Sequence, residues 1–338
     1  MPSTKATTPA KKTAGTSKKV AEKKKAPAKV TVLKLIKNDP YLAEYADAIN
    51  GRYQHMLARK LHLAGPSGNL SEFADGYLYF GLHRQDDGSW VLREWAPNAT
   101  DIYVVGDFNG WKESAKFAMK RVGKTGNWEI KIKDKSFKHG SLFKLNVHWD
   151  GGQGERIPAW INRVVQDPET KIFSAQAWAP EQPYEWKETK FKPATDPLLI
   201  YECHIGMAQD EEKVGSYVEF RDNVLPRVAH QGYNCIQIMA VQEHPYYGSF
   251  GYHVSSFFAP SSRFGTPEEL KSLIDKAHSM GIAVIMDIVH SHAVKNENEG
   301  LGNFAGDPCQ YFCQGDRREH PAWDSLCFDY GKDQVVHF

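Results

Sequence analysis

The residues best suited to chemistry follow an apolar segment in the second half of the chain. Asp287 is the only acid in the run 282–289, and His290 and His292 come within five residues of it. An ionised carboxylate on a buried strand is costly unless a cation or several hydrogen-bond donors meet it, so Asp287 requires a partner. We interpret this grouping as one wall of a binding site. Two structural alternatives are an acid that reaches solvent at the strand end and a core histidine at position 290.

Two more apolar segments, 199–204 and 235–241, are predicted to be buried strands with similar residues at their ends. The polar and aromatic side chains at or just after these ends are Glu202, Cys203, His204, His244, Tyr246, Tyr247, Tyr252 and His253. Aromatic rings can cover the C–H faces of a sugar while carboxylates and imidazoles bind its hydroxyl groups. Because no basic cluster accompanies these side chains, they favour an uncharged ligand with many hydroxyls, namely a sugar.

Helices are predicted between the three apolar strands. One helix is expected over residues 217–231, and a second opens with a capping box at Thr266 and Glu269 and stops at Gly281. Continuous apolar strands joined by helices indicate a parallel sheet covered on both faces, either a (β/α)8 barrel or a doubly wound sheet. No glycine-rich phosphate turn follows any of these strands, which argues against nucleotide binding. In a barrel, the working residues gather at the carboxyl ends of the strands.

Between residues 77 and 166 the apolar pattern has a period of two, which is typical of short strands. The predicted strands are residues 77–84, 90–95, 101–105, 128–133 and 142–149. Short strands at regular spacing without intervening helices predict a small β-sandwich. Trp128 lies on an alternating strand and is expected in the core, whereas Trp111 closes a turn.

The N-terminal region has a different composition. Asp39 and Pro40 are typical of an N-cap and a first helical position, and predict an amphipathic helix that ends near Gly65. Residues 1–30 contain almost no bulky apolar side chains, so we predict a disordered tail. A plastid transit peptide and a nucleic-acid-binding arm are the alternatives, but lysine replaces the expected arginine and no aromatic residue is interleaved with the lysines.

The net charge of +1 combines two opposite regions. Residues 1–30 hold nine lysines and one glutamate, whereas the other 308 residues carry 33 basic and 40 acidic side chains. An acidic body argues against duplex nucleic acid as a partner. No stretch approaches the ~20 apolar residues of a membrane span, and a secretory signal core is absent from the first 30 residues. We therefore predict no membrane and no nucleic-acid partner, and a cytoplasmic location with the plastid as an alternative.

The five cysteines are an odd number and too sparse for a disulfide framework in a chain of 338 residues, which indicates a reducing compartment. Cys309 and Cys313 could share one helix face as half of a metal site. No second ligand pair with zinc-like spacing follows them, so free thiols are the favoured interpretation and no metal is expected.

At this point the motifs resemble those of the α-amylase superfamily, and more narrowly those of the glucan (glycogen or starch) branching enzymes of the eukaryotic type. Residues 287–292 (DIVHSH) are similar to the superfamily's first signature, with Ser291 in place of an asparagine. Residues 106–111 (GDFNGW) resemble the start of a glycogen-binding β-sandwich module. Further matches to branching enzymes are residues 248–254, 257–259, 262–267 and 289–293.

The resemblance implies roles for individual residues. It makes Tyr252 the side chain that stacks on the sugar at the cleaved bond, and His292 a hydrogen-bond partner of that sugar. Asp287 becomes an organiser that pairs with an arginine on the next strand, and not the nucleophile. Trp111 resembles a sugar-stacking position of the module, although a tryptophan that closes a turn also fits plain core packing.

The resemblance also implies a multidomain fold. The expected parts are a disordered tail (1–30), an N-terminal helical segment (31–68), a β-sandwich carbohydrate-binding module (69–178), a linker (179–198) and the first three βα units of an incomplete (β/α)8 barrel (199–338). The last part has 140 residues, whereas a closed barrel takes about 250.

The expected activity of the intact protein is the formation of α-1,6 branches in α-1,4-glucans by retaining transfer, with no cofactor and as a monomer. No catalytic nucleophile or acid/base is placed in the chain; both are expected beyond Phe338, so the chain alone should be inactive. A debranching hydrolase and a non-catalytic glucan-binding protein are the alternatives.

Overall fold

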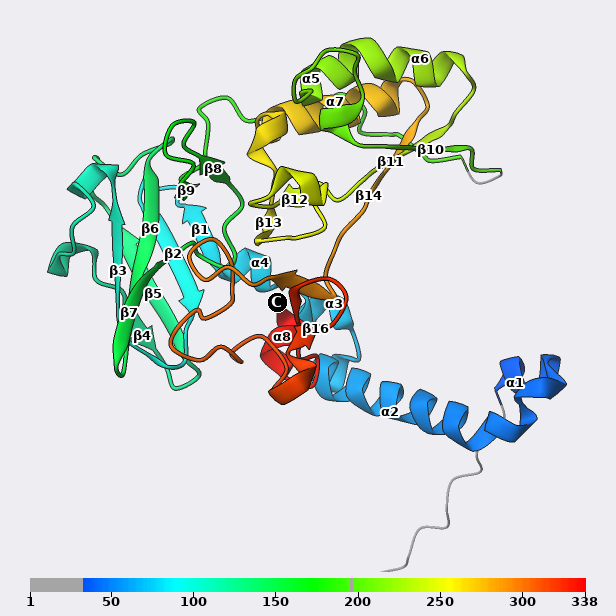
Figure 1. Ribbon diagram of the computed structural model, residues 1–338, viewed down its shortest axis with the longest axis horizontal. Helices are drawn as coiled ribbons and strands as arrows, with labels where there is room; N and C mark the ends of the chain where they lie inside the picture. Colours follow the sequence, from blue (N-terminus) through cyan, green and yellow to red (C-terminus); the bar gives the residue numbers. More distant parts are fainter. Residues whose placement is uncertain (1–32, 195–196) are drawn as a thin grey trace, which may run out of the picture. The chain divides into compact units, whose positions relative to one another are not determined.

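The computed structural model describes residues 33–194 and 197–338, which belong to two compact units, Met1–Gly68 and Asn69–Phe338 (Figure 1). The prediction of a disordered lysine-rich tail concerns residues outside the described ranges. In the described part of the chain, no helix combines the length and the apolar character that crossing a membrane requires.

The first unit is helical. Its elements are α1 (Lys34–Asn38), a 3-10 helix (Pro40–Tyr45), α2 (Ala46–Ala64) and a second 3-10 helix (Gly65–Ser67). The predicted N-cap at Asp39 is confirmed, because its carboxylate accepts a hydrogen bond of 3.0 Å from the backbone N–H of Tyr41. The predicted single α-helix differs in its first six residues, Pro40–Tyr45, which are 3-10 helix instead.

The second unit begins with two helical turns, α3 (Leu70–Phe73) and α4 (Gly76–Tyr79), and continues as a β-sandwich. One sheet has the strand order β1-β2-β5-β4, and the other has the order β3-β6-β9-β8 with β7 added to β6. The strands are β1 (Gly81–Arg84), β2 (Trp90–Trp95), β3 (Ala99–Gly106), β4 (Lys120–Val122), β5 (Asn127–Ile132), β6 (Leu142–Trp149), β7 (Gly152–Arg156), β8 (Val164–Gln166) and β9 (Phe173–Gln176). All their pairings are antiparallel.

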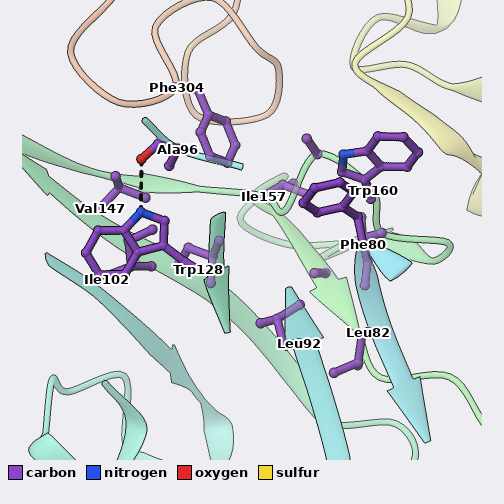
Figure 2. Close-up of a cluster of buried hydrophobic side chains, with 14 of the residues drawn as sticks. Phe80, Leu82, Leu92, Ala96, Ile102, Trp128, Val147, Ile157, Trp160 and Phe304 are labelled. Atoms are coloured by element: carbon purple, nitrogen blue, oxygen red, sulfur yellow. Dashed lines mark hydrogen bonds between the residues drawn. The ribbon is translucent and has the colours of Figure 1, made fainter. Parts of the chain in front are cut away.

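The predicted sandwich is confirmed, with one strand wrong at its start. Residues 77–79 are the end of α4, and the strand begins only at Gly81, whose φ of +85° breaks the extended backbone. The other predicted strands form as the alternation of apolar and polar residues indicated. In β5, for example, Trp128, Ile130 and Ile132 are all buried on one face. Figure 2 shows this core, in which the Trp128 indole N–H donates to the carbonyl of Ala96 at 2.9 Å.

The second half of this unit contains the three predicted parallel strands, β10 (Ile200–Cys203), β11 (Cys235–Ile238) and β14 (Ala283–Met286), in the order β10-β11-β14. The predicted capping box is present, because the Thr266 hydroxyl and the Glu269 carboxylate each accept the other's backbone N–H at the start of α7 (Pro267–Ser279). The helix predicted over 217–231 is formed by α5 (Tyr217–Glu219), a π-helical turn (Phe220–Val224) and α6 (Leu225–His230).

These helices cover one face of the three-stranded sheet (Figure 1). The expectation that both faces are covered is wrong for the described residues, because Glu202 and Ile285, which the register places on the face opposite to Tyr201 and Val284, are exposed. Met286 on the covered face is also 39% exposed, because β14 is the edge strand of the described sheet.

The segment from 293 to 330, to which the sequence assigns no element, is partly structured. A sheet of order β15-β17-β16 forms from β15 (His292–Val294), β16 (Glu319–His320) and β17 (Ser325–Cys327), and a last helix, α8, spans Asp333–His337. These strands are too short to produce a periodic signal. A second short antiparallel pair joins β12 (Gln242–Glu243) to β13 (Ser256–Pro260).

The five cysteines are free thiols. Cys309 and Cys313 do not share a helix face, because residues 309–313 form turns and an isolated bridge. In the described ranges, no group of three or more histidine, cysteine or acidic side chains is placed to hold a metal ion.

Candidate functional site

Tyr252 and Asp287 meet at the carboxyl ends of the second and third parallel strands. Asp287 directly follows β14, and its backbone N–H still donates to the carbonyl of Ile238 at 2.9 Å, so the ladder continues to this position. The Tyr252 hydroxyl donates to Oδ2 of Asp287 at 2.9 Å. Burial, and secondarily the Asp287 carboxylate, raise the pKa of Tyr252 to about 12, so this phenol stays a donor at neutral pH.

The predicted need of Asp287 for a partner is therefore met, within the described residues, by a neutral hydroxyl from the preceding loop. The arginine that the resemblance implies on a following strand stays a prediction. Asp287 is only partly buried, because the sheet is open beyond β14. The acid therefore reaches solvent at the strand end, as the first structural alternative expects, and in addition accepts the Tyr252 hydroxyl.

His292 lies on β15 and is only 6% exposed. Its Nδ1 is buried and has no hydrogen-bond partner among the described residues. Burial lowers the pKa of His292, and the nearby His253 and His320 lower it further, so the ring is neutral at physiological pH. A neutral imidazole can donate from one nitrogen and accept at the other, which suits binding to a sugar hydroxyl.

The loop that carries Tyr252 also carries His253, whose Nε2 lies 3.0 Å from the carbonyl oxygen of Trp323. The His253 and His292 rings lie 6.4 Å apart. The backbone N–H of Val294 donates to the carbonyl of Val254 at 3.0 Å, which ties β15 to the same loop. The structure thus places Tyr252, Asp287 and His292 around one loop, although no hydrogen bond among the described residues joins His292 to the other two.

Gln242 and Glu243 position this loop, and sequence reasoning missed both. The Gln242 side chain donates to the carbonyl of Phe257 at 3.0 Å and accepts from the N–H of Val289 at 2.9 Å, so it joins the second loop to the residues after β14. Glu243 is fully buried and accepts three hydrogen bonds from Ser261 and Ser262. The sequence indicates the role of Gln242 and Glu243 only by their position, as two polar residues directly after the predicted apolar strand 235–241.

Arg263 completes the support of this loop. Its guanidinium lies 3.3 Å from Oε1 of Glu243 and donates to the carbonyl of Pro245 at 2.8 Å. The buried Glu243 carboxylate thus has several hydrogen-bond donors and an arginine as partners. The loop that presents Tyr252 is therefore fixed at its base.

Other residues predicted for the site make no hydrogen bond to Tyr252 or Asp287 among the described contacts, although the charge of Glu202 contributes to the raised pKa of Tyr252. His204 and His244 are buried, and both ring nitrogens of His204 lack a partner in the described residues. Burial raises the pKa of the Cys203 thiol to about 12, which makes it inert at neutral pH. Glu202 is exposed near Gln237, and Tyr246 is exposed.

His290 is exposed, and its backbone carbonyl accepts a hydrogen bond from the Tyr330 hydroxyl. The alternative interpretation of His290 as a core histidine is therefore wrong.

Trp111 of the sandwich is 41% exposed, which excludes the core alternative for this residue. Its φ of +59° follows a turn in which the N–H of Trp111 donates to the carbonyl of Gly106 at 2.8 Å and Asn109 accepts from the N–H of Gly106. Trp128 is 4% exposed, which confirms its predicted core position.

Comparison with protein families matches two separate parts of the chain. Residues 79–168 match carbohydrate-binding module 48, the isoamylase N-terminal domain, and residues 225–318 match the catalytic domain of alpha amylase. Two similar solved structures are a putative alpha amylase from Salmonella typhimurium (TM-score 0.62, 22% identity, 77% of this chain and 40% of that one) and a pullulanase from Paenibacillus barengoltzii (TM-score 0.62, 18% identity, 78% and 46%). The chain is therefore a carbohydrate-binding module of this type followed by part of an amylase-type catalytic domain.

Curated relatives narrow the assignment. A 1,4-alpha-glucan-branching enzyme of Yarrowia lipolytica is 45% identical over 315 residues, covering 90% of this chain and 45% of the relative. The enzymes of the same name from Dictyostelium discoideum and Saccharomyces cerevisiae are each 44% identical, over 90% and 89% of this chain. Over about 90% of its length the chain is similar to 1,4-alpha-glucan-branching enzymes, and it spans just under half the length of the curated relatives it matches.

Proposed function

We propose that this chain forms the substrate-binding part of an enzyme that makes α-1,6 branches in α-1,4-glucans. The observation that carries the proposal is the Tyr252–Asp287 hydrogen bond of 2.9 Å, with the buried His292 in ring contact with His253 of the same loop, in a chain similar to branching enzymes. Tyr252 supplies an aromatic face, and the hydrogen bond to Asp287 holds the Tyr252 ring in position. His292 supplies a neutral imidazole with an unsatisfied nitrogen.

The reaction that this site would serve is a retaining double displacement. A carboxylate attacks the anomeric carbon, the α-1,4 bond breaks, and a carboxylic acid protonates the departing 4-oxygen, which becomes a hydroxyl group. The same residue then deprotonates a 6-hydroxyl of an acceptor chain, which attacks the anomeric carbon and releases the first carboxylate. Because the chemistry needs no electron transfer and no activated donor, it requires no cofactor.

In this proposal Asp287 is neither of the two carboxyl groups. Retaining transfer needs two carboxyl groups about 5–5.5 Å apart, whereas Asp287 is held by Tyr252 and no second acid contacts it in the described residues. We place neither the nucleophile nor the acid/base in these 338 residues. The chain by itself is expected to bind glucan and to form no branches.

The proposed partner is a glycogen- or starch-type α-glucan. In this proposal the module at residues 69–178 binds the glucan with Trp111, and residues 199–338 bind it at Tyr252. The acidic balance outside the tail supports an uncharged polymer and no nucleic acid. We further propose that the intact protein acts as a monomer in the cytoplasm, without membrane attachment.

The test joins this chain to the part of the Yarrowia relative that follows the aligned region. The chimera is incubated with amylose, and α-1,6 linkages are counted by proton NMR while reducing ends are measured. Branching predicts new α-1,6 linkages at a constant number of reducing ends, because each cut is followed by transfer. New reducing ends without branches would show hydrolysis and contradict the proposal.

Two variants complete this experiment. Tyr252→Ala in the chimera should lower the branching rate at least tenfold, whereas exposed Tyr41, 89% accessible in the first unit, serves as the matched control in Tyr41→Ala. Branch formation by the 338-residue chain alone would contradict the assignment of the two catalytic carboxyl groups.

A further inference from the structure

Trp323 lies at the tip of the hairpin that joins β16 to β17. His320 pairs with Ser325, so the tip consists of residues 321–324, all of them exposed. The His320 ring stacks on the Trp323 indole with a centroid distance of 4.0 Å and an interplanar angle of 4°. The Trp323 ring also lies 5.1 Å from the ring of His292.

Trp323 does not anchor this hairpin. Its side chain is 52% exposed, whereas Leu326 and Phe328, which follow it, are only 4% and 7% exposed and belong to the main core. An indole gains most of its stabilisation from burial of its large apolar surface, and here half of that surface stays in contact with water. Apart from the contacts with His320 and His292, burial therefore contributes little to the placement of this tryptophan.

The tip is nevertheless held in a defined place. His253 Nε2 lies 3.0 Å from the carbonyl oxygen of Trp323. Lys295 pairs with Asp324, the last residue of the tip, at 2.6 Å and with Glu319 of β16 at 2.9 Å. Positioned aromatic side chains lose little conformational entropy on binding, because two χ angles are already restricted.

A second observation indicates a ligand at the same place. Nδ1 of His292 is buried without a hydrogen-bond partner in the described residues, although such a group costs free energy unless something binds it. The ring that carries this nitrogen is a direct neighbour of the Trp323 indole. A ligand with a hydroxyl group beside a flat apolar face could satisfy both side chains at once.

We propose that Trp323 is a stacking platform for a glucose unit of an α-1,4-glucan, adjacent to the unit that Tyr252 and His292 hold. The inference rests on the proposed function and extends it, because it assigns the hairpin tip to the binding of the glucan chain. It makes Trp323 a determinant of affinity for chains of several units, and gives no role in bond cleavage to this residue.

The test uses the 338-residue chain labelled with 5-fluorotryptophan and titrated with maltoheptaose. Trp323→Phe assigns the fluorine resonance of Trp323 by its disappearance, and Trp111→Phe and Trp186→Phe assign two further exposed tryptophans. The Trp323 resonance should shift in a saturable manner, while that of Trp186, which is 45% exposed and belongs to the segment before β10, should not. Cellopentaose, a β-1,4-linked chain, serves as the control ligand and should cause no shift.

Isothermal titration provides a second measurement in a Trp111→Ala background, which removes the site proposed on the module. Trp323→Ala should weaken maltoheptaose binding at least fivefold, and Trp323→Tyr should restore most of the affinity because it restores an aromatic face. A merely structural role would instead lower the melting temperature without this recovery.

Two outcomes overturn the inference: an unmoved Trp323 resonance at maltoheptaose concentrations that shift the Trp111 resonance, or an unchanged Kd in Trp323→Ala. A shift at Trp323 combined with no branch formation by the chimera would support the inference and count against the proposed function alone.

Discussion

The Tyr252 hydroxyl donates to Oδ2 of Asp287 at 2.9 Å, and these two residues come from different loops, 35 positions apart. The bond joins the loop after β12 to the end of β14. It couples the aromatic face proposed for sugar binding to the open edge of the parallel sheet. Substitution of either residue should therefore change both the loop that carries Tyr252 and the end of β14.

Tyr252→Phe should lower the free energy of unfolding by about 1 kcal/mol, because it removes the donor and leaves a partly buried carboxylate without it. Urea denaturation measures this change. A double-mutant cycle with Asp287→Ala should show a coupling of about 0.5–1.5 kcal/mol between the two side chains. Additive effects of the two substitutions would contradict a bond between them in solution.

Gly251 directly precedes Tyr252, and Gly251→Ala should displace this tyrosine. Its φ is +91°, and an added Cβ would lie 1.8 Å from the carbonyl oxygen of Ala240, so the backbone must move. Gly232→Ala is the matched control, with a φ of +87° but open space around the new Cβ. We expect a loss of roughly 1–2 kcal/mol for Gly232→Ala from the left-handed backbone alone. The loss for Gly251→Ala should be clearly larger, and equal melting temperatures would exclude the tight contact.

Phe328 and Trp323 should differ sharply in their effect on stability. Phe328 is 7% exposed and contacts Phe312 and Phe257 at ring distances of 5.1 and 5.2 Å. Phe328→Ala should therefore cost about 3–5 kcal/mol. Trp323→Ala should cost less than about 1 kcal/mol, since half of its surface is already exposed. Guanidinium denaturation of both variants tests this, and a Trp323→Ala loss as large as that of Phe328→Ala would assign Trp323 to the core.

Glu94 should make the stability of the second unit depend on pH. Burial raises the pKa of this fully buried carboxyl from 4.5 to about 8, against the opposing effect of the N–H groups of Trp95 and Ala159. The unfolded chain loses the proton near pH 4.5, whereas the folded protein keeps it up to about pH 8. Stability is therefore fully present below pH 4.5 and declines as the pH rises to about 8, by on the order of a few kcal/mol.

Glu94→Gln isolates this effect, because glutamine has a similar shape and does not titrate. The free energy of unfolding of the unsubstituted protein minus that of Glu94→Gln should fall between pH 5 and pH 8 and level off above pH 8. Urea denaturation at a series of pH values measures the difference. A constant difference across this range would mean that Glu94 has an ordinary pKa.

Trp111 and Trp128 provide a matched pair on the module. Trp111→Ala should reduce cosedimentation with glycogen several-fold and leave the melting temperature nearly unchanged, because the indole is exposed. Trp128→Ala should cost about 3–5 kcal/mol, since it removes a core side chain together with its hydrogen bond to Ala96. Unchanged glycogen binding by Trp111→Ala would contradict the proposed contact between Trp111 and the glucan.

Local sequence patterns predicted the elements whose signals are local. The capping box at Thr266 and the N-cap at Asp39 depend on contacts two or three residues away, and both are present. The alternation in β5 and β6 depends on which face is buried, and it led to the sandwich. Helix α4 was missed because Gly76–Tyr79 is flanked by aromatic residues that also suit a strand, and helix formation over four residues is decided by packing.

The sequence alone predicted the types of side chain at the strand ends and the resemblance to branching enzymes. Which of those residues meet was decided by tertiary structure, because the Tyr252–Asp287 and His292–Trp323 contacts join positions that are about 30 residues or more apart. A contact between distant residues depends on the paths of two loops, and no local pattern records it. For the same reason the exposure of Trp323 and the burial of Phe328 follow from the short β15-β17-β16 sheet and its hairpin, and not from their residue types.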